Sequence, residues 1–203
     1  MAASVPVNVF GEPITDATVR KYFPDKKEIT RKDRAYFAYN LKEADKKYDK
    51  SQEYVLQQSK EWHGQDAATL ITIYNATGDT LTYYTHHDFH GHIETPHKYT
   101  QEIQNGQWAA FLHVGSHAAV VYSGRNNNGQ EIAWLHSWYN EASDNRKFHT
   151  HLKRLSSNSR LELQVLRYDY LDKDETRVEA HTSFKDAGSN QFYADSKANA
   201  HIL

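Results

Sequence analysis

The sequence contains no cysteine, and this single absence excludes several classes of chemistry. Disulfide frameworks, cysteine-ligated zinc, thiolate nucleophiles and cysteine-bound iron–sulfur clusters all depend on that side chain. A chain of 203 residues is nevertheless long enough to bury a sizeable hydrophobic core without cross-links. The sequence therefore predicts one ordinary domain, or one domain with a helical extension, that is stabilised by packing.

A surplus of positive charge is also missing. The chain has 24 Lys and Arg residues against 26 Asp and Glu residues, so its net charge is −2 when histidine is neutral. Domains that bind nucleic acids usually carry a clear excess of basic side chains. Neither DNA nor RNA is therefore expected as a partner.

Long hydrophobic runs are absent too. The longest apolar stretches, residues 70–74 and 108–114, are far shorter than the roughly 20 residues that a membrane-spanning helix needs. The first ten residues contain neither the basic nor the apolar region of a secretory signal. From these absences we expect a soluble, cytoplasmic protein without a transmembrane segment, and the oligomeric state is left open.

Motifs of common catalytic sites are missing as well. The chain has no Gly-x-Ser-x-Gly sequence, which would present a nucleophilic serine, and no Gly-Lys-Ser/Thr loop for phosphate. His136 and Ser137 are neighbours in a predicted strand, so their side chains point to opposite faces and do not form a catalytic pair. We therefore expect binding rather than catalysis, without a cofactor.

Histidine and aromatic residues are abundant by contrast. The chain has 13 histidines and 26 aromatic residues, namely 4 Trp, 14 Tyr and 8 Phe. Ten of the histidines fall between residues 86 and 151, where the sequence pattern predicts strands. Protonation of histidine is therefore expected to dominate any pH dependence near neutrality.

Residues 1–64 are predicted to form an N-terminal strap and a two-helix arm. The expected segments are an irregular strap over residues 1–28 and helices over 31–44 and 50–62. Thr30, with Asp33 three positions later, is typical of a helix start, and a break is expected near residues 47–49. Each helix has one narrow apolar stripe, which suits docking onto another element rather than a free-standing bundle.

From residue 67 onward, short alternating runs separated by turn residues predict strands. The expected strands cover residues 68–75, 80–87, 107–114, 117–123, 131–139, 147–153, 160–170 and 177–184. Turn residues predict hairpins at residues 75–79 and 115–116. This spacing is typical of an antiparallel sandwich or barrel, so we expect a mainly β domain over residues 65–203.

Pairs of histidines predict one candidate site. The pairs are His90 with His92 and His149 with His151. The His-x-His spacing places two imidazoles on one face of a strand, and these rings, with Asp88 or Glu94, would suit a transition metal. The alternative function is accordingly a histidine-ligated metal-binding protein or a metal-dependent enzyme. The plainer interpretation is that exposed strand histidines make local hydrogen bonds.

A second candidate site lies in the predicted strand over residues 131–139. Trp134 and Trp138 fall on one face of this strand, whereas Ser137 and Tyr139 fall on the other. Half of each strand must face a core, so most of the aromatic residues are expected to be buried. The remaining rings would suit stacking on a sugar or contact with a quaternary ammonium group.

Several strings of residues carry a resemblance to a known family. They are Val9-Phe-Gly-Glu-Pro-Ile14, Ile29-Thr-Arg-Lys-Asp-Arg-Ala35, Tyr74-Asn-Ala-Thr-Gly-Asp-Thr-Leu81, Asp88-Phe-His-Gly-His-Ile93, Asn105-Gly-Gln-Trp-Ala-Ala-Phe-Leu-His113, Ala119-Val-Val-Tyr122 and Trp134-Leu-His-Ser-Trp138. These strings resemble the plant 23-kDa jasmonate-induced protein family over most of the chain, as far as about Tyr170. The resemblance implies a plant protein that responds to jasmonate and stress, and we expect a role in defence.

The order of the later strings is also similar to the actinoporin-like β-sandwich of sea-anemone pore formers and fungal sphingolipid-binding, lectin-like proteins. In that fold a serine, an adjacent proline and a cluster of tyrosines hold a phosphocholine headgroup. The resemblance implies that Ser137 occupies the serine position, with Trp138 and Tyr139 beside it. Tyr168 and Tyr170 are candidates for the tyrosine cluster, whereas the proline is missing here.

We therefore predict an actinoporin-like antiparallel β-sandwich with an N-terminal two-helix arm. Its expected function is non-enzymatic binding of a membrane-lipid headgroup or a glycan. The predicted ligand-binding residues are Ser137, Trp138, Tyr139, Tyr168 and Tyr170.

Overall fold

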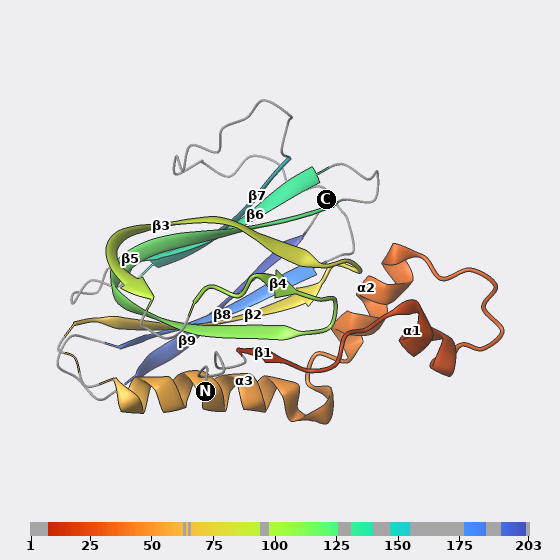
Figure 1. The fold of residues 1–203 in the computed structure, drawn as a ribbon, viewed down its shortest axis with the longest axis horizontal. Helices are drawn as coiled ribbons and strands as arrows, with labels where there is room; N and C mark the ends of the chain where they lie inside the picture. The colour runs from red at the N-terminus through yellow and green to blue at the C-terminus, as the bar shows by residue number, and fades with distance from the viewer. Residues whose placement is uncertain are drawn as a thin grey trace, which may run out of the picture.

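The protein consists of two layers of strands with a long helix beneath them and shorter helices at one end (Figure 1). A computed structural model describes residues 8–62, 64, 66–93, 98–125, 131–139, 147–154, 177–185 and 192–201, with side chains as far as residue 139. The strands are β1 (Val9–Phe10), β2 (Ala68–Ala76), β3 (Leu81–Ile93), β4 (Glu102–Ile103), β5 (Trp108–Arg125), β6 (Glu131–Tyr139), β7 (Lys147–Arg154), β8 (Arg177–Lys185) and β9 (Phe192–His201). The helices are α1 (Asp16–Tyr22), α2 (Arg31–Asn40), the 3-10 helix η1 (Ala44–Lys46) and α3 (Lys47–Glu61).

The long strand β5 belongs to both layers. Its first half pairs with β1 and β2, and β2 continues the layer to β8 and β9. Its second half pairs with β3 and β6, which extend that layer to β4 and β7. Every pairing is antiparallel, so the predicted mainly β, antiparallel sandwich is confirmed.

The predicted hairpin at residues 115–116 is wrong, because β5 runs without a turn from Trp108 to Arg125. Gly115 has a φ of +106°, and across the strand pair Gly91 of β3 has a φ of +117°. A side chain on either glycine would overlap the backbone of the other strand. Gly115 therefore bends the strand from one layer into the other, where the sequence pattern indicated a turn.

The predicted hairpin at residues 75–79 is also wrong, because β2 and β3 do not pair with each other and each pairs with β5. Most other predicted strands are confirmed to within a residue or two of their ends. The predicted strand over residues 80–87 extends further, to Ile93, and β1, β4 and β9 were not predicted. The strand predicted over residues 160–170 lies outside the described residues.

The helical arm also differs in part from its prediction. Thr30 and Asp33 form a reciprocal capping box at the start of α2, as expected. The break before α3 lies at Asp45 and Lys46, which have positive φ angles of 57° and 55°. The N-terminal segment is not wholly irregular, because Thr15 starts helix α1 with a capping box formed with Thr18.

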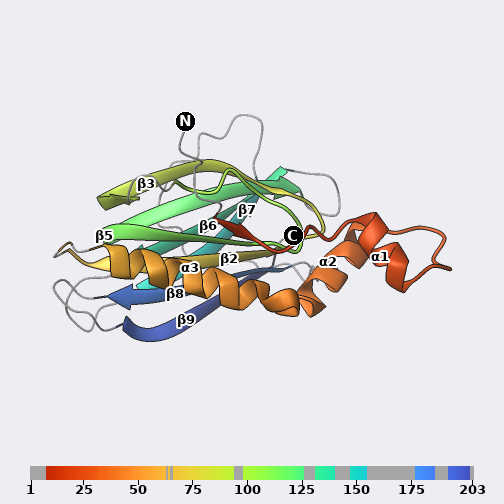
Figure 2. The same ribbon diagram turned by 60° about the horizontal axis from the view of Figure 1, so that its bottom comes forward.

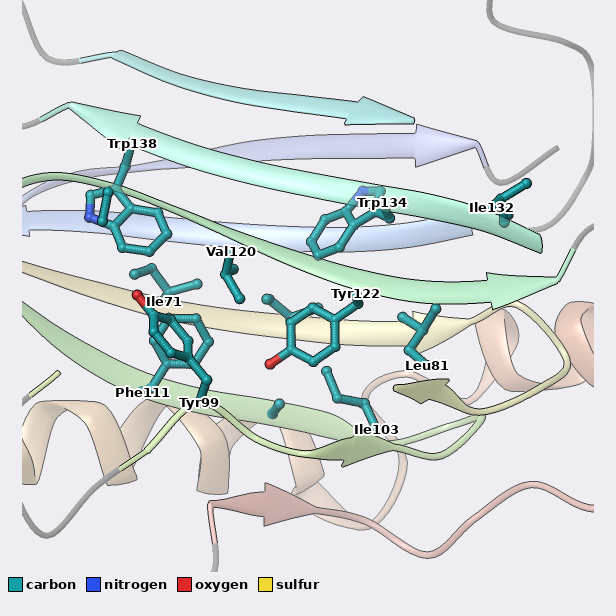
Figure 3. Packing of buried hydrophobic residues seen from close by; sticks show 13 residues of the cluster. Ile71, Leu81, Tyr99, Ile103, Phe111, Val120, Tyr122, Ile132, Trp134 and Trp138 are labelled. Carbon is teal, nitrogen blue, oxygen red and sulfur yellow. The ribbon is translucent and has the colours of Figure 1, made fainter. Parts of the chain in front are cut away.

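The main hydrophobic core fills the space between the two layers. Figure 3 shows Trp134 and Trp138 of β6 pointing into this space, where they meet side chains of the other strands. The core cluster is Ile71, Ile73, Leu81, Tyr99, Ile103, Ala109, Phe111, Ala118, Val120, Tyr122, Ile132, Trp134 and Trp138. This cluster fixes which face of β6 points inward.

The helices bury the outer side of the layer that contains β2. Val55 of α3 packs against Leu70 and Leu112, and α3 lies along this layer in both views (Figures 1 and 2). Ile14, Val19 and Ala38 of the arm pack on the end of β2 and the start of β5. Within the described residues, no helix is long and apolar enough to cross a bilayer.

Candidate functional site

The predicted site residues on β6 are divided between two faces of the strand. Trp138 is 1% exposed and belongs to the core, and Figure 3 shows its ring directed toward Tyr99 and Phe111. Ser137 and Tyr139 are half-buried, and strand alternation places them on the opposite face. In this structure Trp138 is therefore a core residue and does not share a surface with Ser137 and Tyr139.

Tyr139 instead joins a row of rings that crosses three strands. The ring of His117 on β5 lies 5.1 Å from the ring of Tyr139 and perpendicular to it. On its other side, His117 stacks on Phe89 of β3 with ring centres 4.4 Å apart and an interplanar angle of 21°. His87 adds an edge-on contact to Phe89, also at 4.4 Å. We call Phe89, His117 and Tyr139, with His87 and Ser137, the cross-strand strip.

The register of the strands explains how this strip forms. His117 is paired with both His90 and Tyr139, and Ala119 is paired with both His87 and Ser137. Residues directly opposite in antiparallel strands point to the same face. The small side chain of Ala119 therefore lies between His87 and Ser137 in the second row of the strip.

A β-bulge brings Phe89 onto this face. The pairing of β3 with β5 shifts between Asp88 and His90 and again between His90 and His92. The extra residue lets Asp88 point toward the core while Phe89 stacks on His117 on the other face. The Phe89 side chain remains 46% exposed, so it offers an accessible apolar surface beside His117 and Tyr139.

Asp88 anchors the inner side of the same strand segment. Its carboxylate accepts a hydrogen bond of 3.1 Å from the Tyr99 hydroxyl and lies 3.4 Å from Nε2 of His113. Nε2 of His86 is 3.7 Å away, and Nδ1 of His86 is hydrogen-bonded to the Tyr83 hydroxyl. We call these residues the Asp88 cluster.

Burial and the Asp88 charge shift the pKa values of His113 and Tyr99. The side chain of His113 is wholly buried, and this burial lowers its pKa to about 4, although the Asp88 carboxylate opposes the shift. Burial and the same carboxylate raise the pKa of Tyr99. The indole Nε1 of Trp138 donates to Nδ1 of His113 over 3.4 Å, so the proton of the neutral ring belongs on Nε2, facing Asp88.

The two predicted histidine pairs lie on strands that are not neighbours. β5 and β6 lie between the strand of His90 and His92 and the strand of His149 and His151, which is a separation of about 14 Å at ~4.8 Å per strand. The bulge at Gly91 also breaks the simple alternation between His90 and His92. Among the residues that the structure describes, no group of three His, Cys, Asp or Glu side chains is placed to hold a metal ion.

The histidines of the predicted pairs have other surroundings. His90 is exposed, and its Nδ1 lies 3.2 Å from the Ser116 hydroxyl. The backbone of β7 places His149 opposite Ser137 and His151 opposite Leu135. Tyr168, Tyr170 and Glu94 lie outside the described residues, so the predicted tyrosine cluster stays a prediction.

Sequence reasoning missed the contribution of Phe89 and His117. Alternation along a single strand could place Tyr139 on the face opposite the core, but the contact with Phe89 depends on a bulge and on an unbroken β5. The close run of aromatic and histidine residues around residue 89 was the available signal, and it was interpreted as a metal site.

Comparisons with known proteins agree with this architecture. A family model described as Nakanori-like protein matches residues 10–183. The solved structure of the lipid-binding protein Nakanori superposes with a TM-score of 0.70 and 21% sequence identity, covering 95% of this chain and 100% of that one. This likeness shows the fold, which is actinoporin-like.

Two plant proteins are similar in sequence. The 23 kDa jasmonate-induced protein of Hordeum vulgare is 42% identical over 139 residues, which is 64% of this chain and 65% of that protein. The jasmonate-induced protein homolog of Atriplex canescens is 30% identical over 76 residues, or 35% of this chain and 40% of that protein. The matched region thus spans at most about two thirds of either relative.

Proposed function

Because the chain belongs to the Nakanori-like protein family, we propose that it is a lipid-binding protein of the plant stress response and that the cross-strand strip contacts the lipid headgroup. The family contains a protein described as lipid-binding, and two relatives are described as jasmonate-induced. The observation that carries the proposal is the row of Phe89, His117 and Tyr139 on the face opposite the core.

The chemistry of the strip suits a zwitterionic headgroup. The faces of Phe and Tyr rings attract quaternary ammonium groups, as in choline. The Ser137 hydroxyl, in the same strand as Tyr139, can donate a hydrogen bond to a phosphate oxygen. Neither interaction requires a net positive charge, which the chain lacks. A choline phospholipid is therefore the headgroup class that we propose.

The proposal predicts that removing a ring from the strip weakens binding to phosphatidylcholine vesicles. We expect Phe89→Ala and Tyr139→Ala each to lower the affinity about tenfold, because a ring contact with a quaternary ammonium contributes roughly 1–2 kcal/mol. Vesicle co-sedimentation over a range of lipid concentrations measures this change.

Leu56→Ala is the matched control. Leu56 is 41% exposed and lies on α3, which packs against the layer that contains β2. This variant should bind like the wild type. Unfolding curves establish that Phe89→Ala, which removes an exposed ring, remains folded. If both strip variants bind vesicles as the wild type does, the proposal is contradicted. If they keep vesicle binding but lose binding to immobilised glycans, the strip binds a sugar instead.

A further inference from the structure

The most exposed large hydrophobic side chains of the described residues lie in the helical arm, away from the cross-strand strip. Tyr36 is 65% exposed, Tyr22 is 63% exposed and Phe23 is 53% exposed, whereas Phe89 and Tyr84 on β3 reach 46%. Single exposed apolar side chains are common on protein surfaces, whereas several that gather in one place can mark an interaction site. The arm therefore requires an explanation that the strip does not supply.

Tyr22 and Phe23 form a small aromatic group at the end of α1. The ring of Tyr22 lies 4.8 Å from the ring of Phe37 on α2, and the ring of Phe23 lies 6.2 Å from it. Both rings shield Phe37, which is half-buried. Yet each still exposes more than half of its surface. We call Tyr22, Phe23 and Phe37 the arm tip.

Basic side chains surround the arm tip. Residues 20–36 contain seven Lys and Arg and three Asp and Glu, a local charge of +4 in a chain whose net charge is −2. The exposed cations are Arg20, Lys21, Lys26, Lys27 and Lys32, and the exposed acids in this segment are Asp25 and Glu28. The third acid, Asp33, is bound within the arm by Lys26 and Thr30.

The arm tip and the strip lie at opposite ends of the strands. Arg34 of α2 donates to the Gly78 carbonyl and pairs with Asp79, so the arm is attached where β2 passes into β3. The strip lies beside the Gly91 and Gly115 bend, at the other end of β3. Both views show α1 and α2 extending beyond the layers of strands (Figures 1 and 2).

We propose that the arm tip is a second membrane contact and that it binds the surface of an anionic bilayer. Aromatic rings are favoured at the level of the lipid headgroups, and each basic side chain near an anionic surface adds to the attraction. The arm combines both features on a projecting segment, whereas the rest of the chain has a net negative charge. This site recognises surface charge rather than one headgroup, and it is independent of the strip.

The test compares two charge reversals of equal size. On vesicles of phosphatidylcholine and phosphatidylserine, Lys21→Glu with Lys27→Glu should lower the affinity about tenfold or more. The matched control reverses Lys50 and Lys60, two exposed lysines of α3, and should stay within about twofold of the wild type. Tyr22→Ala with Phe23→Ala should also weaken binding, relative to Leu56→Ala.

The result expected for the wild type is tighter binding to vesicles with phosphatidylserine than to phosphatidylcholine alone, with a gain that added salt reduces. Equal binding by the two charge-reversal variants, or no effect of phosphatidylserine on the wild type, would overturn the inference. A different pattern is expected if only the proposed role of the strip is wrong. Phe89→Ala then binds phosphatidylcholine vesicles as the wild type does, and phosphatidylserine still tightens binding.

Discussion

Asp88 and Phe89 are consecutive residues that connect the interior of the molecule with the cross-strand strip. Asp88 faces Tyr99 and His113 on the core side, and Phe89 stacks on His117 on the other side. Fixing the carboxylate also fixes the bulge that presents the ring. Asp88 is thus a positioning residue for the strip.

At the residue scale, His113 is expected to make the protein sensitive to acid. Its pKa is about 4 in the folded protein and close to 6.5 in an unfolded chain. Between these values the unfolded state binds more protons, so the free energy of unfolding falls as the pH is lowered from about 6.5 to 4, by about 3 kcal/mol at most. Urea unfolding at several pH values measures this loss.

The comparison with His113→Gln isolates the contribution of this one histidine. Glutamine keeps a polar side chain near Trp138 and Asp88 but does not titrate. As the pH falls, protonation of His113 in the unfolded state lowers the free energy of unfolding of the wild type but not that of the variant. We therefore expect the difference in stability between the two proteins to shrink. If the two proteins lose stability in parallel between pH 6.5 and 4, other groups cause the acid sensitivity.

At the scale of elements, the bend in β5 decides where the strip forms. Gly91 and Gly115 pack against each other with positive φ angles, which L side chains adopt at a cost of roughly 1–2 kcal/mol. In Gly115→Ala the new methyl group would also overlap Gly91 and the carbonyl of His90. We expect this variant to lose more than about 2 kcal/mol of stability and to bind phosphatidylcholine vesicles weakly.

Gly124 provides a control in the same strand. A methyl group at Gly124 would meet only the end of the Leu81 side chain, at 3.1 Å, and this glycine has no positive φ. Gly124→Ala should therefore lose less stability than Gly115→Ala in the same urea titration. Equal losses would show that the bend does not depend on the glycine pair.

The same elements show how far the sequence alone could lead. Alternation in residues 131–139 correctly predicted β6 and its division into two faces, and Thr30 with Asp33 marked the start of α2. These signals are local. The local sequence of residues 115–116 resembles a turn. These residues form a bend instead because Gly115 packs against Gly91, which lies 24 positions earlier in the chain.

The candidate site depended even more on distant contacts. Alternation already placed Trp138 on the face opposite Ser137 and Tyr139, but the fold resemblance grouped the three residues because they are neighbours in the sequence. Burial of the Trp138 ring in the core cluster separates it from that surface. Replacing such a ring by alanine costs about 3–5 kcal/mol, so Trp138→Ala would report on stability rather than on binding.

At the scale of the whole molecule, the two sides of the sandwich have different roles. Helix α3 covers the layer that contains β2, whereas the strip lies on the layer formed by β3, β5 and β6. The arm adds a basic, aromatic tip at the far end. A protein of this design has its proposed headgroup site on a rigid sheet and its proposed charge-sensing contact on a projecting segment.

The most direct measurement is hydroxyl-radical footprinting of the protein with and without phosphatidylcholine vesicles, because it reports the exposure of each side chain. We expect vesicles to reduce the oxidation of Phe89, His117 and Tyr139 and to leave the oxidation of Leu56 on α3 unchanged. Unchanged oxidation of these three strip residues on the vesicle-bound protein, with protection confined to another surface, would contradict the claim that the strip contacts the lipid headgroup.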